Sequence, residues 1–517
     1  MPGTDLLNDR LITIDTGGGP ERVSLPDVLA HLASARQASF PRLRAHQRHG
    51  WHVFLTSLGR IALDHASRDD LPEAAADWRA LLGALTRDHP TAWQLIVEDH
   101  DRPAFLQPAV PDGDVTGFKA TATPDMIDLH QTGRDHAVKA FHDNAAAPED
   151  WIYALVSAQT LAPHSHKDNF RCVRTAGGYA GRVVITTGER DDPAALFRRD
   201  LRALNGLRAP ERFHRGGPGL IWLTPWGGGD DEALSLNGLH PQFIEVARRI
   251  RLTGRRGGVT ALTKGSRTPR FAAARASAGV NGLIGDPWTP IDRAGSRVLH
   301  PPKDGFDSSL TLGLLLDARR YTPAPLQVPR PEELDSPRLL VIARTLPADR
   351  GWLGSAERII EIPRTARHTL GEIQRAPESG ELIRAALAEV DRLRHEALLP
   401  AVARLADPLH REIDWDRLRN DPEHQRRVMI ARRTYSRTIE PAFLGALHLL
   451  NQEPRHMGPG HSQLRIAAVE AARSSLDAAM RNLRLSGHQG QRARMIASNS
   501  LESGLERLLR PMMRKAA

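Results

Sequence analysis

The hydrophobic and polar positions of this chain follow two different patterns, and the change falls near Thr365. Before it, short apolar runs separated by glycine and proline predict strands at 9–15, 21–25, 181–188, 219–226, 337–345 and 356–363. Helices are predicted from Ser24, across 45–88, and over 241–252, where apolar residues recur at helical spacing. The first part of the chain therefore mixes helices and strands.

After Thr365 glycine becomes rare, and alanine, leucine, arginine and glutamate dominate. Helical periodicity recurs in four long stretches with short breaks between them, at 381–406, 422–450, 462–485 and 491–513. Four long helices joined by short connections favour an antiparallel bundle. The predicted fold class is α+β, with a large mixed α/β N-terminal domain over 1–365 followed by a C-terminal four-helix bundle over 366–517.

Composition limits the cellular setting and the kinds of site. No run of about 18 apolar residues is present, which argues against a transmembrane helix. The first residues lack the basic and then apolar pattern of a signal peptide. The single cysteine, Cys172, excludes an intrachain disulfide and a zinc site made only of cysteines. These features predict a cytoplasmic protein with no membrane partner.

The chain is basic, with a formal net charge of +9 and a pI near 10.2. Of its 70 lysines and arginines only six are lysine. Arginine matches phosphate bidentately and stacks on bases, so this surface would suit nucleic acid. Five arginines cluster at the end of the predicted helix 241–252, namely Arg248, Arg249, Arg251, Arg255 and Arg256. They are typical either of a solvated helix end or of a phosphate-binding surface.

One glycine-rich motif precedes the predicted strand 181–188. "RTAGGYAGR" combines three glycines with an aromatic residue, namely Gly177, Gly178, Gly181 and Tyr179. Glycines let another backbone come close, and their N–H groups can face phosphate. The motif is not a dinucleotide fingerprint, because its spacing differs and no helix follows. An ordinary loop remains the alternative.

A second motif, "HSHKD", has a spacing that can bind a catalytic metal, through His164, His166 and Asp168. A metal-dependent hydrolase is therefore the alternative function, and a plain surface loop is the alternative structure. No nucleophile elbow, Walker loop or C-x-x-C pair occurs. The chain is interpreted as a binding protein rather than an enzyme, with no cofactor.

The most distinctive stretch is "GDPWTPI", 285–291, in which two prolines bracket Trp288. It follows "VKAFHDN", the glycine-rich motif and "FIEVARRIRL", and it precedes the helical region. In this order the chain resembles, over most of its length, the large subunit of the type I-E CRISPR surveillance complex Cascade, the CasA family. The resemblance implies a subunit without catalysis that sits at the 5′ end of the guide RNA. Such a subunit reads the protospacer-adjacent motif in duplex DNA and helps to open the duplex.

The resemblance also implies which residues contact the DNA motif. The glycine-rich loop would approach through the minor groove, which suits glycine because the groove is narrow, with Gly177, Gly178, Tyr179 and Gly181. A basic finger would enter the same groove through Lys264, Arg267 or Arg270. Trp288 is expected to brace this finger rather than to touch DNA.

Three further sites follow from the resemblance. Where the family often has a wedge glutamine this chain has Trp352, with Arg350 and Leu353 as alternatives, and an aromatic wedge can pry bases apart. The RNA handle would be contacted by Phe141 and Asn144. The displaced strand would follow basic residues of the bundle, namely Arg481, Arg484, Arg492 and Arg494. No metal is expected, since the cysteines that some members use for zinc are missing.

The implied partners are guide RNA (crRNA), double-stranded target DNA, and the backbone, handle-binding and small subunits of Cascade. The sequence contains no nuclease or helicase motif. Strand cleavage is therefore expected from a nuclease that acts in trans or is fused to another subunit.

Overall fold

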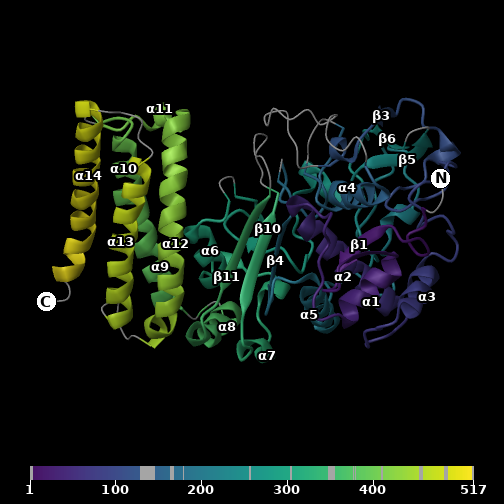
Figure 1. The fold of residues 1–517 in the computed structure, drawn as a ribbon, viewed down its shortest axis with the longest axis horizontal. Helices are drawn as coiled ribbons and strands as arrows, with labels where there is room; N and C mark the ends of the chain where they lie inside the picture. The colour runs from purple at the N-terminus through teal and green to yellow at the C-terminus, as the bar shows by residue number, and fades with distance from the viewer. Residues whose placement is uncertain are drawn as a thin grey trace. The chain divides into compact units, whose positions relative to one another are not determined.

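The computed structural model describes residues 4–128, 146–163, 168–178, 180–255, 258–302, 305–346, 355–376, 378, 380–408, 412–452, 458–481 and 487–514. The chain forms two compact units (Figure 1). Unit 1 comprises Met1–Gly305, Ala324–Pro329 and Ser336–Ile360. Unit 2 comprises Phe306–Pro323, Arg330–Asp335 and Glu361–Ala517. The mixture of sheets in unit 1 and helices in unit 2 confirms the predicted α+β class.

Unit 2 takes in two segments that the sequence analysis assigned to the domain 1–365. The first of them contains α6 (Ser308–Leu316), which is almost wholly apolar and needs a helical neighbour to cover it. Its N-cap, Asp307, accepts a 2.7 Å hydrogen bond from the guanidinium of Arg394, and the backbone N–H of Ser308 donates to Ser436. The segment is thus held by residues far along the chain, a connection that the local pattern does not reveal.

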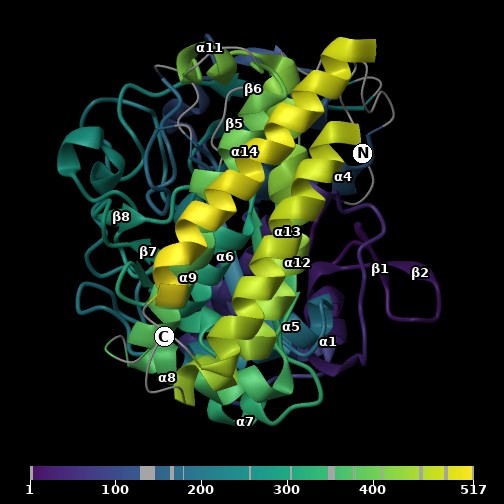
Figure 2. The same ribbon diagram turned by 90° about the vertical axis from the view of Figure 1, so that its left-hand side faces the viewer.

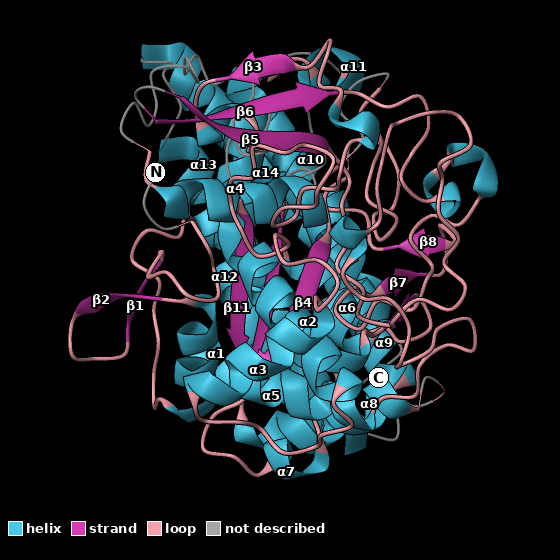
Figure 3. Ribbon diagram, turned by 90° about the vertical axis from the view of Figure 1, so that its right-hand side faces the viewer, coloured by secondary structure: helices cyan, strands magenta, loops and turns pink. Residues whose placement is uncertain are grey.

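Unit 1 contains two three-stranded sheets, which Figure 3 shows as separate ribbons. One has the order β11-β10-β4, with β4 (Val183–Gly188), β10 (Leu340–Thr345) and β11 (Ala356–Glu361). The other has the order β3-β6-β5, with β3 (Lys119–Thr121), β5 (Arg249–Arg255) and β6 (Gly258–Lys264). Two further antiparallel pairs lie among the described residues of this unit, β1 (Ile12–Asp15) with β2 (Pro20–Val23), and β7 (Ile291–Asp292) with β8 (Arg297–Val298). Five of the six predicted strands are therefore confirmed.

The helices of unit 1 are α1 (Leu25–Ser34), α2 (Arg48–His65), α3 (Ala75–Leu85), α4 (Pro148–Thr160) and α5 (Pro193–Gly206). The predicted start at Ser24 is confirmed. Its hydroxyl accepts from the backbone N–H of Asp27, and the Asp27 carboxylate accepts from the Ser24 backbone N–H at 3.0 Å. This reciprocal capping satisfies two backbone donors that a helix start otherwise leaves open.

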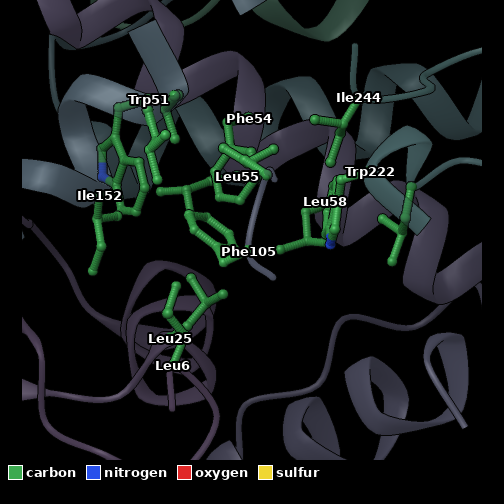
Figure 4. Packing of buried hydrophobic residues seen from close by; sticks show 14 of the residues in the cluster. Leu6, Leu25, Trp51, Phe54, Leu55, Leu58, Phe105, Ile152, Trp222 and Ile244 are labelled. Carbon is green, nitrogen blue, oxygen red and sulfur yellow. The ribbon is translucent and has the colours of Figure 1, made fainter. Parts of the chain in front are cut away.

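Aromatic and aliphatic side chains of α2 form the centre of the unit 1 core (Figure 4). Trp51 stacks on Phe54 with 5.5 Å between ring centroids, and Phe54 meets Phe105 edge-on at 5.6 Å. Phe105 in turn contacts Trp222, at 6.1 Å. Each fully buried side chain of this size contributes roughly 1.5–3 kcal/mol. The core fixes α2 and thereby the loops that surround it.

Two predicted elements of unit 1 are wrong. The segment 241–252 is not a helix: it starts in a turn at Pro241 and becomes strand β5 at Arg249. Ile244 pairs with Leu220 as a parallel bridge, and the Gln159 side chain bonds both the N–H and the carbonyl of Arg248. The segment 219–226 is a short 3₁₀ turn at Ile221–Leu223 rather than a strand. In both cases tertiary partners override the local apolar pattern.

Arg248, Arg249 and Arg251 of the arginine cluster are consequently not a solvated helix end, whereas Arg256 lies outside the described residues. Arg251 is 1 % exposed, and it donates hydrogen bonds to the carbonyls of Gln107 and Pro108 at 3.0 and 3.3 Å. Arg248 is also buried and donates to the carbonyls of Pro163 and Phe170. These guanidiniums hold loops to the β5 strand from inside the unit.

Unit 2 is helical apart from β9 (Tyr321–Thr322) in the part that the structure describes. Short helices are α7 (Pro331–Leu334), α8 (Arg367–Arg375) and α11 (Trp415–Arg419). The long ones are α9 (Glu381–Leu393), α12 (Pro422–Gln452), α13 (Pro459–Arg481) and α14 (Gly487–Arg514). A π-helical turn, Arg394–Leu398, continues α9 into α10 (Leu399–Arg404), so the four predicted long helices are confirmed.

The long helices of unit 2 lie side by side. Figure 2 shows α12 and α13 as neighbours, with α14 crossing at an angle. Buried residues of α12 recur at helical spacing, for example Tyr435, Ile439 and Phe443. On α13 the buried positions include Ala468 and Ala472, whose small side chains let the helix axes come close. Among the described residues, no helix is long and apolar enough to cross a membrane.

Candidate nucleic-acid interface

A glycine-rich loop joins α4 to β4 and presents part of its backbone at the surface of unit 1. Gly177 and Gly178 have φ values of +102° and +59°, which side chains rarely adopt. Gly178 is exposed, and no heavy atom lies within 4 Å of the position that its Cβ would take. The backbone here is open to close approach by another molecule. Tyr179 lies outside the described residues.

Gly181 has a different role from the other two glycines. It is buried, and a Cβ at this position would lie 2.8 Å from the carbonyl oxygen of Leu346. Real Cβ atoms do not approach a backbone oxygen so closely, so this glycine permits the chain after the loop to pack against the end of β10. The expected approach to DNA therefore falls to Gly177 and Gly178.

A buried carboxylate lies under the glycine-rich loop. Glu245 accepts a 2.6 Å hydrogen bond from the backbone N–H of Val173, and its other oxygen is 3.9 Å from the guanidinium of Arg174. Burial raises the pKa of Glu245 to about 7, although the Arg174 charge opposes the rise. Arg174 is itself held over the ring of Phe243, 3.8 Å from its centroid. The base of the loop is thus fixed by charged groups that water does not reach.

The segment around "GDPWTPI" braces the loop from the other side. A Cβ on Gly282 would lie 2.9 Å from the carbonyl oxygen of Thr175, so the two backbones are in direct contact. Asp286 accepts two 2.7 Å hydrogen bonds from the buried Arg182. Burial alone would raise the pKa of Asp286, but the Arg182 charge holds it below its usual value. Trp288 is 1 % exposed, and its ring N–H donates to Asp200 at 2.9 Å, which gives it a structural role.

The basic finger follows β6. Lys264, at the end of that strand, is exposed, and its ammonium donates to the Thr116 carbonyl at 2.9 Å. The side chain of Arg267 is 76 % exposed, and its guanidinium lies 3.3 Å from the carboxylate of Asp230, which is also exposed. Exposed ion pairs of this kind contribute little stability, so an anion can compete with Asp230 for Arg267 at small cost.

Arg270 differs from the other two finger residues. It is 3 % exposed and donates to the carbonyls of Thr224 and Pro225, at 2.8 and 3.2 Å. The guanidinium also lies 5.1 Å from the ring centroid of Trp226. Arg270 therefore anchors the finger inside the unit, and the solvent-facing cations are Lys264 and Arg267.

Hydrogen bonds connect the glycine-rich loop to the finger. The backbone N–H of Ser266 donates to the carbonyl of Asp168 at 2.9 Å. The Nε of Arg171 donates to the carbonyl of Ala274 at 3.2 Å. The two segments that the resemblance assigned to one groove are thus neighbours on one part of unit 1.

Several predicted site residues lie outside the described part of the chain. They are the wedge candidates Arg350, Trp352 and Leu353, the RNA-handle residues Phe141 and Asn144, and Arg484 of the displaced-strand set. The wedge candidates fall in the connection between β10 and β11, whose strand ends are described. These assignments remain predictions.

The displaced-strand residues that are described lie on two helices of unit 2. Arg481 ends α13, and Arg492 and Arg494 lie in the first part of α14. All three are exposed. No ion pair within the described residues engages any of them.

The alternative metal site cannot be assembled from what is described. His164 and His166 lie outside the described residues, and Asp168 is exposed. Within the described ranges no group of three or more His, Cys, Asp and Glu side chains could hold a metal ion.

Sequence reasoning missed the residues that surround the glycine-rich loop in space. Arg171, Asn281, Arg297 and His300 line one open hollow together with Gly177 and Gly178. The segments that line this hollow are far apart in the chain, and in the sequence their arginines cannot be told from the many other arginines. No spacing motif joins them.

Solved structures with a similar fold are known, although comparison of the sequence alone finds no match. No family model matches the sequence, and no curated protein matches it. The structure is similar to that of a CRISPR-associated protein from Thermus thermophilus, with a TM-score of 0.62, 16 % identity, and coverage of 98 % of this chain and 99 % of that one. It is similar to CRISPR-associated protein Cse1 from Acidimicrobium ferrooxidans, with a TM-score of 0.56, 12 % identity, and 98 % of each chain covered.

A third similar structure is a chain of a CRISPR RNA-guided surveillance complex, with a TM-score of 0.51, 16 % identity, and coverage of 97 % of this chain and 99 % of that one. The resemblance inferred from the sequence is thereby confirmed at the level of fold. Over nearly its whole length the chain has the fold of the CRISPR-associated protein Cse1.

Proposed function

We propose that this chain is a non-catalytic, DNA-recognition subunit of a type I-E CRISPR surveillance complex. In this role it reads the motif beside the target through the minor groove of duplex DNA, helps to open the duplex, and positions a nuclease carried by another polypeptide. Guide RNA reads the target sequence by base pairing, while protein reads only the short flanking motif, a division of labour established for RNA-guided systems.

The observation that carries the proposal is the full-length fold match to a chain of such a complex. Two features of unit 1 support the DNA-reading part. Gly178 offers open backbone, and the glycine-rich loop is hydrogen-bonded to the segment that carries Lys264 and Arg267. The minor groove presents a degenerate pattern, so a reader of this type would accept several motifs.

The remaining partner and site assignments belong to the same proposal. Arg350 or Trp352 would separate the first base pair, Phe141 and Asn144 would contact the RNA handle, and the displaced strand would follow Arg481, Arg484, Arg492 and Arg494. The other partners would be crRNA and the remaining Cascade subunits, and the setting would be the cytoplasm.

The test is a Gly178→Leu variant in the complex assembled with the other subunits and a guide RNA. No heavy atom of the described protein lies within 4 Å of the position of the added Cβ, so the side chain starts in open space where a ligand would approach this backbone. Gly238→Leu is the matched control, because Gly238 is also exposed, has a φ of +79° and is equally free of neighbours. Both variants carry a backbone strain of roughly 1–2 kcal/mol.

Both variants are expected to co-purify with guide RNA of uniform length. The Gly178 variant should bind target duplex at least tenfold more weakly than the wild type, and the Gly238 variant within about twofold of it, as measured by electrophoretic mobility shift. Failure of the wild-type chain to assemble with guide RNA would overturn the subunit role. Equal affinities of the two variants would remove the glycine-rich loop from DNA reading.

A further inference from the structure

An open hollow of roughly 300 Å³ lies beside the glycine-rich loop in unit 1. Its lining includes Arg171, Gly177, Gly178, Asn281, Arg297 and His300. No carboxylate is among the described residues that line it. Two guanidiniums in a hollow without an acidic residue make a site for an anion.

Arg297 is the unusual member of this set. It belongs to β8, is half-buried, and its Nε is shielded from water without a hydrogen-bond partner. No residue in the described part of the chain gives its guanidinium a hydrogen bond or an ion pair. By contrast, the buried Arg182 of the same unit is fully engaged by Asp286. A half-buried guanidinium without any acceptor is costly, and an anion in the hollow would supply one to its N–H groups.

Arg171 supplies the second charge and is held in place by the protein. Its Nε donates to the carbonyl of Ala274 at 3.2 Å, and its Nη1 donates to the carbonyl of Thr175. Carbonyl partners orient the guanidinium without cancelling its charge. Burial and the nearby Arg297 charge lower the pKa of His300, so the imidazole is neutral near pH 7 and the charge of the hollow comes from the two arginines.

The backbone of the glycine-rich loop adds donors to the same hollow. Neither the N–H of Gly177 nor that of Gly178 has a hydrogen-bond acceptor among the described residues. Successive backbone N–H groups in turn conformations of this kind form anion-binding concavities. A tetrahedral phosphate with several acceptor oxygens can use a guanidinium and backbone N–H groups together.

We propose that this hollow binds a phosphodiester of the DNA backbone, with Arg297 as its principal ligand and Arg171 and the loop amides beside it. The inference deepens the proposed function, on which it rests, by adding a phosphate contact to the loop that reads the motif. Phosphate contacts fix the register of a protein on the duplex, while groove contacts read sequence.

Nucleic acid is favoured over a small free anion by what lies next to the hollow. The Arg171 hydrogen bond to Ala274 and the Ser266 hydrogen bond to Asp168 join the hollow to the segment of the exposed Lys264 and Arg267. A polyanion that enters the hollow can continue along these cations. The hollow is also open to the surface, as a contact with one phosphate of a long chain requires.

The test uses the full-length chain and a 20-bp DNA duplex, with binding followed by fluorescence anisotropy over a series of KCl concentrations. The variant is Arg297→Ala. The matched control is Arg208→Ala, which removes the same charge from an exposed position of unit 1. Arg297→Ala should weaken binding about tenfold and reduce the slope of log K against log[KCl] by about 1, the value for one phosphate. Arg208→Ala should stay within about twofold of the wild type with an unchanged slope.

Equal losses of duplex affinity in the two variants would overturn the proposal, because removing any one positive charge would then have the same effect. A second arm titrates the wild-type chain with inorganic phosphate. If phosphate displaces the duplex only at concentrations at which KCl also displaces it, the result supports a site for the DNA backbone. If phosphate displaces the duplex specifically at low millimolar concentrations, the result overturns the proposal in favour of a site for a free anion.

The outcome is separable from that of the proposed function, since it requires neither guide RNA nor other subunits. A chain that fails to assemble with guide RNA but loses duplex binding in Arg297→Ala would keep the phosphate site and lose the surveillance role.

Discussion

Replacing Glu245 with glutamine should change how the stability of unit 1 depends on pH. The Glu245 carboxyl is fully buried beneath the glycine-rich loop, and its pKa is raised from 4.5 to about 7. A carboxyl with a raised pKa in the folded state costs stability as it ionises. The free energy of unfolding should therefore fall as the pH rises from about 4.5 to about 7 and then level off.

The size of the effect follows from the difference between the two pKa values. At about 1.4 kcal/mol per pH unit, a rise from 4.5 to about 7 corresponds to about 3 kcal/mol. The substituted glutamine side chain would keep the shape and a hydrogen-bond acceptor for the N–H of Val173 but would not ionise. Glu245→Gln should thus gain stability relative to the wild type by about 3 kcal/mol between pH 4.5 and pH 8.

Urea unfolding followed by tryptophan fluorescence at several pH values measures this difference. Trp415 is the only tryptophan of unit 2, so the signal reports mainly on unit 1. Other titrating groups are common to both proteins and cancel in the comparison. Glu211→Gln, at an exposed position, is the control and should remain within about 0.5 kcal/mol of the wild type. The reasoning would be refuted if the difference in the free energy of unfolding between Glu245→Gln and the wild type stayed constant or became smaller as the pH rises.

Two further substitutions test the frame around the loop. Gly181→Ala places a methyl group 2.8 Å from the backbone oxygen of Leu346 and should destabilise unit 1 by roughly 1–3 kcal/mol in urea unfolding. An unchanged free energy of unfolding would mean that the backbone at Gly181 and Leu346 can shift apart freely. Asp286→Ala leaves the buried Arg182 without its carboxylate and should cost roughly 3–5 kcal/mol in the same assay, whereas a loss below about 1 kcal/mol would show that water reaches the pair.

The sequence predicted best those elements whose pattern is set locally. The capping box at Ser24, the strand over 181–188 and the four long helices after Thr365 all follow from periodicity and end signals. The helix α4, by contrast, is buried over nearly its whole surface, so it lacks the apolar stripe that identifies a surface helix. The prediction of a helix over 241–252 is wrong because the apolar spacing of this segment fits both the helical and the strand period, and in the fold Ile244 pairs with Leu220.

The candidate site was predictable only in part. Glycine enrichment identified the loop, but which glycine is open and which is packed depends on Leu346, a residue far along the chain. The family resemblance pointed to Lys264, Arg267 and Arg270 alike, and only the fold separates the exposed cations from the anchor. Arg297 carried no signal at all, since what distinguishes it is the lack of a partner among the described residues.

The arginines inside unit 1 change how the formal charge of +9 should be understood. Arg248, Arg251 and Arg270 count toward that total, yet their guanidiniums face carbonyl oxygens rather than solvent. A polyanion in solution is still attracted by these charges at a distance, but it cannot bond to their guanidiniums directly. Direct contacts, and with them selectivity for one face of the molecule, should come from the handful of arginines and lysines that water can reach.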